Sequence, residues 1–252
     1  MWHPNCSAFT PTLRYYHPVL LLALDTCDSR GSIALLDGSR LLAEVPHPPS
    51  EEFSSWLLPA VSRLLAEHRV SHADLAGYAV ASGPGSFTGV RVGLTTAKAW
   101  SEVYHKPIFP ASRLAVLADR APGTATHVAT FIDAQRSQIF AALYSRSSGA
   151  SNTLIKESVI APDDFFSQAA KMSQGEVAWV TLDPHMFESS AFARLHSAPD
   201  PKLTVVQPPL AAAIALHVIA QPKPFQLDAL TLDANYVRRS DAEIFGKKTA
   251  AT

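Results

Sequence analysis

The sequence contains little cysteine and little charge. Its 252 residues include two cysteines, Cys6 and Cys27, too few for a disulfide framework or a four-cysteine zinc site. Charged residues make up 17% of the chain, and the formal net charge is −1, which argues against a protein that binds nucleic acid along its whole surface. This composition favours a reduced, cytoplasmic compartment.

Long apolar runs are also lacking. The run from Val19 to Leu24 is far shorter than the roughly 20 residues that a membrane-spanning helix needs. Residues 1–18 lack the basic start and apolar stretch of a secretory signal, and we expect them to form a flexible tail. With a hydrophobic content of 47%, the rest is predicted to be globular, with enough apolar surface to favour a protein partner.

Several glycines gather in one place, the segment 82–93, which reads SGPGSFTGVRVG and is called the glycine segment below. An apolar run at 77–81 before it predicts a buried strand, and 94–104 after it predicts a helix with Thr88 as N-cap. The segment lacks the Gly-Lys-Ser/Thr of a phosphate-binding Walker loop and the Gly-x-Gly-x-x-Gly of a dinucleotide fingerprint. Two interpretations stay open: a tight turn packed under its own helix, or a contact with a nucleotide or a partner.

The strands suggest an internal repeat. The first apolar strand, 19–24, ends at Asp25, and the chain returns as 32–36 before an Asp37-Gly38 hairpin turn and a third strand at 40–45. A second apolar strand, 127–132, ends in the same way at Asp133 and returns as 139–144. Such repetition predicts two related lobes.

The boundary between the lobes is predicted at Pro122-Gly123. We therefore expect a tail over residues 1–18, a first lobe over 19–121 and a second lobe over 122–252. An alanine-rich helix within 208–220 is expected to close against the first lobe.

Two helices of the first lobe carry more apolar side chains than one sheet would cover. The first is expected to start at Ser50 and to bend or break at Pro59. Residues 53, 57, 61, 64 and 65 form one apolar face, while 56, 58 and 60 lie off it. The helix of 94–104 repeats the pattern with small residues. Each such helix needs a second helix as cover, from this chain or from another.

Several stretches together resemble the TsaB (YeaZ) family. They are 23–26 (ALDT), 57–59 (LLP), the glycine segment, 132–136 (IDAQR), 236–238 (YVR) and 240–243 (SDAE). The resemblance runs from about residue 19 to 245, and the glycine segment is its longest and most specific part. The chain departs from the family pattern at Phe53, where a histidine is usual, and at Cys27, where serine is common.

The resemblance implies an α/β fold of the actin/sugar-kinase/Hsp70-like, ribonuclease H-like class, with two related lobes that each hold a mixed sheet and flanking helices. It implies a non-catalytic scaffold of the bacterial machinery that adds threonylcarbamoyl to the tRNA adenosine beside the anticodon. The expected partners are the catalytic paralogue TsaD, the ATPase TsaE through the complex, and a second copy when the chain is alone. Contact with tRNA is expected to be indirect or minor.

The family pairs through the two first-lobe helices, which gives a predicted partner surface. Its residues are Phe53, Trp56, Leu57, Val61, Leu64, Val90, Leu94, Ala97 and Trp100. We expect Leu57→Glu or Ala97→Glu to abolish pairing while leaving the chain folded.

Nucleotide binding is the main alternative, and it implies a stand-alone ATP-hydrolysing enzyme of sugar-kinase type. The candidate contacts are Asp25, Thr26, Gly83, Gly85, Ser86 and Asp133. The two aspartates could hold a magnesium-bound water, or they could be turn residues that satisfy nearby backbone N–H groups. We expect no cofactor on this chain alone, with ATP or ADP and magnesium in the assembled complex.

Three further kinds of site have weaker support. His68 and His72 have the spacing of a metal pair, but the helix is expected to end between them, and no third ligand is evident. Ser86 lacks the setting of a hydrolase nucleophile. Arg238, Arg239, Lys247 and Lys248 in the tail could touch tRNA phosphates or be solvated.

Overall fold

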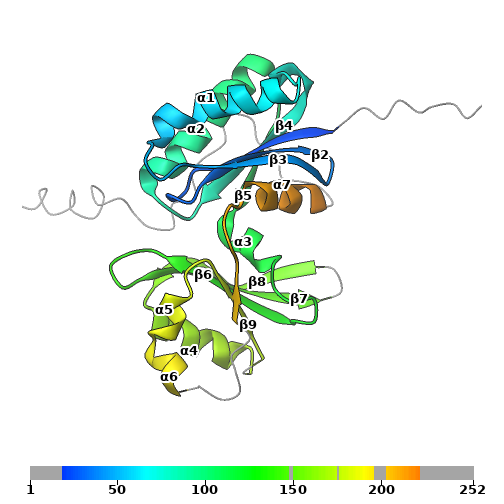
Figure 1. Cartoon of the computed structure of the whole chain (residues 1–252). Coiled ribbons are helices and arrows are strands. Elements are labelled where there is room, and N and C mark those ends of the chain that lie inside the picture. The colour runs from blue at the N-terminus through cyan, green and yellow to red at the C-terminus, as the bar shows by residue number, and fades with distance from the viewer. Residues whose placement is uncertain (1–18, 148–149, 175, 196–202, 222–252) are drawn as a thin grey trace, which may run out of the picture.

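The computed structural model describes residues 19–147, 150–174, 176–195 and 203–221, which form two stacked lobes (Figure 1). Each lobe is built on a five-stranded mixed sheet. The predicted tail of 1–18 and the motifs and basic residues at 236–248 lie outside the described residues.

The first sheet has the order β3-β2-β1-β4-β5. Its strands are β1 (Leu20–Asp25), β2 (Ser32–Asp37), β3 (Arg40–Pro46), β4 (Leu75–Gly83) and β5 (Ile108–Ser112). The central strand β1 pairs antiparallel with β2 and parallel with β4. Every residue of β1 is buried, as expected for a strand that is covered on both faces.

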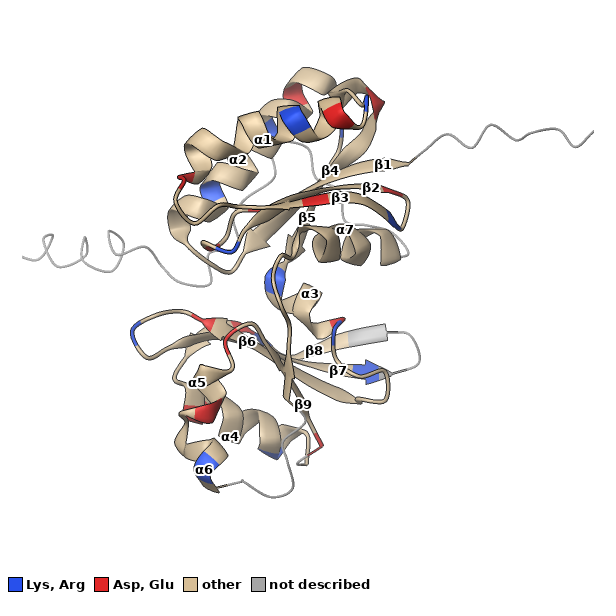
Figure 2. Cartoon of the chain, viewed as in Figure 1, with Lys and Arg blue, Asp and Glu red and all other residues tan. Residues whose placement is uncertain are grey.

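Helices cover both faces of this sheet. α1 (Phe53–Glu67) and α2 (Phe87–Tyr104) lie side by side on the outer face, and α7 (Ala211–Ala220) lies on the face turned towards the second lobe (Figure 1). α7 carries no Lys, Arg, Asp or Glu (Figure 2). Its first backbone N–H groups donate to the first sheet, from Ala211 to Ser32 Oγ at 3.0 Å and from Ala212 to Glu44 Oε1 at 2.9 Å. These acceptors satisfy N–H groups that a helix start leaves free.

The second sheet has the order β10-β9-β6-β7-β8. Its strands are β6 (His127–Asp133), β7 (Ile139–Ser147), β8 (Ala150–Ile160), β9 (Ala178–Thr181) and β10 (Leu203–Val205). Taken from β8, this is the strand order of the first sheet, with β6 in the place of β1. Asp25 and Asp133 therefore end equivalent strands, and the predicted repetition is confirmed.

The remaining helices belong to the region between the lobes and to the far side of the second sheet. α3 (Arg113–Ala118) packs against strands of both sheets, while α4 (Pro162–Met172), α5 (His185–Glu188) and α6 (Ala191–Leu195) lie beyond the second sheet (Figure 1). One apolar core extends from the first lobe across to the near face of the second sheet. A separate aromatic core around Phe131, Phe166 and Trp179 fills the far face.

The first-lobe helices differ from expectation in three ways. α1 begins at Phe53 rather than at Ser50, and it runs without interruption through Pro59, which lies on the exposed side. α2 begins at Phe87, so its N-cap is Ser86 and not Thr88. Ser86 Oγ accepts the N–H of Gly89 at 3.4 Å.

The buried side of α1 includes two of the three residues predicted to lie off its apolar face, Trp56 and Ala60. Its buried residues are Trp56, Leu57, Ala60, Val61, Leu64 and Leu65. At 100° per residue these positions form a single broad arc of about half the helix circumference, which the sheet and α2 cover. Leu58 alone among the large apolar residues of α1 is exposed.

Within the described residues, no helix has both the length and the apolar character that a membrane crossing requires.

Candidate functional site

The glycine segment packs directly on the turn that follows β1. A Cβ atom at Gly85 would lie 2.3 Å from the carbonyl oxygen of Cys27, and one at Gly89 would lie 2.1 Å from that of Thr26. Hydrogen bonds join the same backbones: Ser86 N–H donates to the Cys27 carbonyl at 2.6 Å, and Thr26 Oγ1 donates to the Gly89 carbonyl at 2.7 Å. Glycine is needed here because the two backbones approach too closely for any side chain. This geometry favours the packing interpretation of the segment.

Asp25 lies beneath this contact and faces an arginine. The carboxylate is fully buried, its Oδ1 accepts the N–H of Cys27 at 3.0 Å, and its Oδ2 lies 3.2 Å from Nε of Arg113. Arg113 is the first residue of α3 and is 1% exposed. A second nitrogen of Arg113 donates to Asp28 Oδ2 at 2.8 Å. The Arg113 guanidinium thus places a positive charge beside the buried Asp25 carboxylate.

The charged groups in this cluster shift one another's pKa values. Burial alone would lower the pKa of Arg113, but the negative charges of Asp25 and Asp28 outweigh it and raise the pKa. Burial alone would raise the pKa of Asp28, but Arg113 and Arg30 hold it well below its usual range. Burial, with the Asp25 charge, raises the pKa of the Cys27 thiol, so that this cysteine stays protonated and unreactive.

The ion cluster extends into the second lobe. Arg30, in the first-lobe turn, donates to Asp28 Oδ2 and to Asp183 Oδ1, each at 2.8 Å. Asp183 Oδ2 in turn accepts the backbone N–H of Asp133 at 2.9 Å. The structure therefore brings Asp25, Thr26, Gly83, Gly85 and Ser86 together at one site, and connects Asp133 to them through Arg30 and Asp183.

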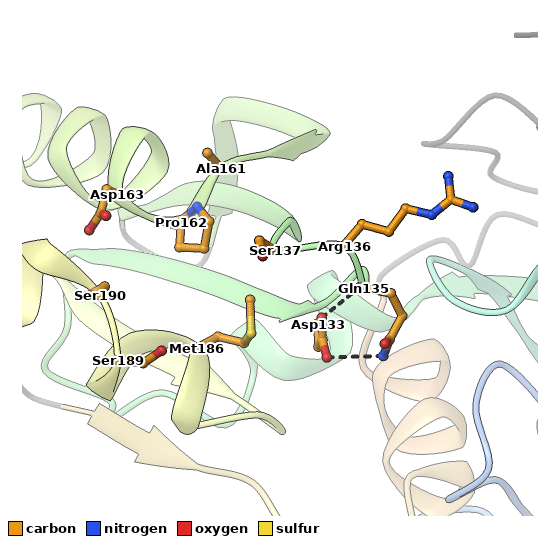
Figure 3. A pocket seen from close by; sticks show the side chains of 10 residues that line it. All are labelled: Asp133, Gln135, Arg136, Ser137, Ala161, Pro162, Asp163, Met186, Ser189 and Ser190. Atoms are coloured by element: carbon orange, nitrogen blue, oxygen red, sulfur yellow. Dashed lines mark hydrogen bonds between the residues drawn. The ribbon is translucent and has the colours of Figure 1, made fainter.

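Asp133 itself borders a pocket of about 490 Å³ in the second lobe, with both polar and apolar lining residues (Figure 3). Its carboxylate accepts hydrogen bonds from the backbone and side-chain amides of Gln135. Asp163, Met186 and Ser190 line other parts of the pocket, and the Arg136 side chain points away from them (Figure 3). The pocket contains carboxylates and hydroxyls but no histidine or cysteine among its lining residues.

The predicted partner residues lie largely inside the chain. Of the nine, seven are buried: Trp56, Leu57, Val61, Leu64, Val90, Leu94 and Ala97. Phe53 and Trp100 are partly buried. Leu57 is 1% exposed and Ala97 is 0% exposed, so a glutamate at either position would place a carboxylate in the core and unfold the lobe. These two substitutions therefore cannot separate pairing from folding, contrary to expectation.

The two candidate histidines do not form a metal pair. α1 ends before His72, as expected, so that His68 and His72 do not share a helix. His68 Nδ1 lies 2.9 Å from the carbonyl oxygen of Leu64, and His72 Nδ1 lies 3.0 Å from the hydroxyl of Tyr78. Among the residues that the structure describes, no three metal-binding side chains gather into a site.

Sequence reasoning missed four charged residues of the interlobe cluster: Asp28, Arg30, Arg113 and Asp183. Asp28 and Arg30 lie within the turn that follows Asp25, so their proximity to it was available from the sequence. Arg113 and Asp183 lie 85 and 153 residues from their partners Asp28 and Arg30. Only the fold brings them there, and neither stands in a motif.

Comparisons with known proteins agree with this architecture. The family model described as TsaD, tRNA N6-adenosine threonylcarbamoyltransferase, matches residues 44–202. The tRNA threonylcarbamoyladenosine biosynthesis protein TsaB of Bacillus subtilis is 35% identical over 129 residues, which cover 51% of this chain and 56% of that protein. The Escherichia coli protein of the same name is 32% identical over 165 residues, 64% of this chain and 70% of the relative.

A solved structure extends the likeness to the whole fold. YeaZ from Pseudomonas aeruginosa matches 84% of this chain and 96% of its own, with a TM-score of 0.66 and 26% identity. The two-lobed fold class expected from the sequence is thereby confirmed. The sequence match to the Bacillus relative spans little more than half of that protein's length. From the Escherichia coli relative and the family model together, the chain belongs to the TsaB (YeaZ) family and is a distant paralogue of TsaD.

Proposed function

We propose that this chain is the non-catalytic subunit that binds and activates TsaD for threonylcarbamoyl transfer to the tRNA adenosine beside the anticodon. Membership of the TsaB family carries the proposal, since the relatives are named for threonylcarbamoyladenosine biosynthesis. The ion cluster supports a non-catalytic role, because Arg113 neutralises the buried Asp25 that a nucleotide-hydrolysing relative would use to hold magnesium-bound water. ATP or ADP with magnesium, TsaE and indirect contact with tRNA belong to the assembled complex in this proposal.

The outward faces of α1 and α2 are the surface that we assign to TsaD. Because the inward residues are buried against the sheet, we expect the exposed apolar side chains of the two helices to make the contacts with TsaD. These are Leu58, 52% exposed, and Phe87, Val103 and Tyr104 on α2, of which Val103 is 67% exposed. Exposed large apolar side chains on adjacent helices are suited to pairing with a second helix pair. The same face would serve a homodimer when the chain is alone.

The test is size-exclusion chromatography with light scattering on the chain mixed with TsaD from the same organism. We expect a heteromeric peak with the unaltered chain and its loss in Leu58→Glu and in Val103→Glu. Leu41→Glu is the matched control, because Leu41 is 47% exposed and stands on β3, in neither helix. Both helix variants should remain folded by circular dichroism, since neither side chain is in the core. Absence of a peak with the unaltered chain would refute the function, whereas equal peaks for all variants would refute only the surface.

A further inference from the structure

One ion pair joins the first-lobe turn to the second lobe. Arg30 contributes both terminal nitrogens: one donates to Asp183 Oδ1 at 2.8 Å and to the Leu182 carbonyl at 3.3 Å, and the other donates to Asp28 Oδ2 at 2.8 Å. The Asp183 side chain is 9% exposed and that of Arg30 is 34% exposed. The pair is thus shielded on the second-lobe side, where a charge-assisted hydrogen bond is stronger than one in water.

The second lobe holds Asp183 in place from its own side. Asp183 Oδ2 accepts the N–H of Asp133 at 2.9 Å, and the Asp183 N–H donates to Thr181 Oγ1 at 2.9 Å. Thr181 Oγ1 donates in turn to the Phe131 carbonyl at 2.7 Å. The carboxylate is therefore fixed to the ends of β6 and β9 before Arg30 reaches it, so little side-chain freedom is lost when the ion pair forms.

On the first-lobe side, the turn of Arg30 packs against the start of α1. A Cβ atom at Gly31 would lie 2.6 Å from the ring of Phe53, which is the first residue of α1. His47 N–H donates to the Gly31 carbonyl at 2.8 Å, and the His47 ring stacks on Phe53 with centroids 3.9 Å apart. A displacement of residues 28–31 would therefore disturb Phe53 and His47 directly, since close packing leaves no space to absorb it.

We propose that the Arg30–Asp183 pair is a latch that couples the position of the second lobe to the start of α1. The apolar core and α3 keep the lobes together at their centre. The latch therefore acts at the edge of the interface, where residues 28–31 of the first lobe meet Asp183 of the second. With the latch closed, the 28–31 turn is held from the second lobe and in turn holds Phe53. With it broken, the turn and the first residues of α1 open more often while the lobes remain folded.

The experiment is hydrogen exchange, followed by mass spectrometry, on the isolated full-length chain. It compares Asp183→Asn, Arg30→Gln and the double variant with Arg40→Gln, which breaks an exposed ion pair within the first lobe. The amide of an asparagine keeps an oxygen for the Asp133 N–H, so Asp183→Asn removes the ion pair with the least disturbance of the second lobe. Because no partner is present, the result does not depend on the proposed function.

We expect each substitution to speed hydrogen exchange in the lobe that does not carry it. Asp183→Asn should speed exchange at 28–31 and 53–57, and Arg30→Gln should speed exchange at 131–133 and 181–184, each roughly tenfold. The double variant should exchange no faster than the faster single variant, because either single change already breaks the Arg30–Asp183 pair. Arg40→Gln should leave these segments unchanged. Effects confined to the lobe that carries each substitution, or additive effects in the double variant, would overturn the latch.

Discussion

The two lobes place equivalent turns in opposite environments. In the first lobe, the turn after β1 is tied down: Asp25 is buried, Arg113 neutralises it, and the glycine segment packs on Thr26 and Cys27. In the second lobe, the turn after β6 has three consecutive exposed residues with left-handed backbone, Gln135, Arg136 and Ser137, and Asp133 borders an open pocket.

The difference originates in the segment that comes after the neighbouring strand. After β4 the glycine segment leads directly into α2, which has 18 residues and whose start lies over the turn. After β9 come Leu182, Asp183 and Pro184 and then α5, which has four residues and covers much less. Shared topology therefore fixes where the two turns lie. The segment that follows β4 or β9 determines whether the turn beside it is buried or remains accessible.

The largest expected loss of stability comes from removing the buried guanidinium of Arg113. Arg113→Ala should destabilise the chain by about 3–5 kcal/mol, because it leaves Asp25 buried without its counter-charge. The second-lobe comparison is His185→Ala, since His185 Nε2 lies 3.9 Å from Asp133 Oδ2 and its side chain is 64% exposed; that change should cost less than about 0.5 kcal/mol. Urea unfolding followed by circular dichroism measures both. Equal losses in the two variants would remove the distinction between the turns.

A smaller effect is expected when a methyl group is placed between the packed backbones. Gly89→Ala should cost about 1–3 kcal/mol, because its Cβ would meet the Thr26 carbonyl, which is backbone and cannot move aside. Gly123→Ala is the control, since nothing lies within 4 Å of a Cβ there. In the second-lobe turn, Ser137→Gly should change stability by no more than about 0.5 kcal/mol, because relief of its left-handed backbone offsets the greater freedom of the unfolded chain. Thermal unfolding would show a lowered midpoint for Gly89→Ala alone.

A further effect, similar in size, is expected on acid stability, and it should arise in the first-lobe turn. The pKa of Asp28 is lower in the folded chain than its unfolded value of about 3.9. Its ion pairs therefore stabilise the fold above that pH, and this contribution is lost as the pH falls towards the folded pKa. Asp28→Asn should lower stability at neutral pH by on the order of 2 kcal/mol, and the gap to the parent should narrow below a pH of about 4. A gap that is constant from neutral pH down through this range would contradict the assignment.

Much of the fold could be predicted from the sequence. The strands and helices of both lobes stand close to where apolar runs and turn residues place them, because β1 and β6 are continuous apolar runs that end at an aspartate. The helix starts were less accurate. Ser50 and Thr88 both have good capping side chains, but α2 begins early enough for Gly89 to reach Thr26, and tertiary packing of this kind overrides local preference.

The site was less predictable for a different reason. The glycine segment and the two aspartates were found because they stand next to strands, whereas Arg113 and Asp183 gain their roles only from chain segments far away in sequence. The buried residues of α1 also span a wider arc than the narrow apolar face predicted from the sequence. Trp56 and Leu57 are neighbours in the sequence, yet both belong to the buried arc, because a helix on a twisted sheet buries a wider face than one narrow stripe. The predicted partner residues therefore included side chains that the lobe needs for itself.

The position of α7 bears on how the chain is made. α7 covers the inner face of the first sheet and buries Ala211, Ile214, Ala215 and Val218 there, although almost the whole second lobe precedes it in the sequence. In topological terms the second lobe is an insertion within the first. During synthesis from the N-terminus, the first sheet emerges early but lacks this cover until residue 220 has left the ribosome. The two lobes therefore cannot mature strictly one after the other, and a nascent chain that stops short of α7 would expose the apolar underside of β1, β2 and β4 to other chains.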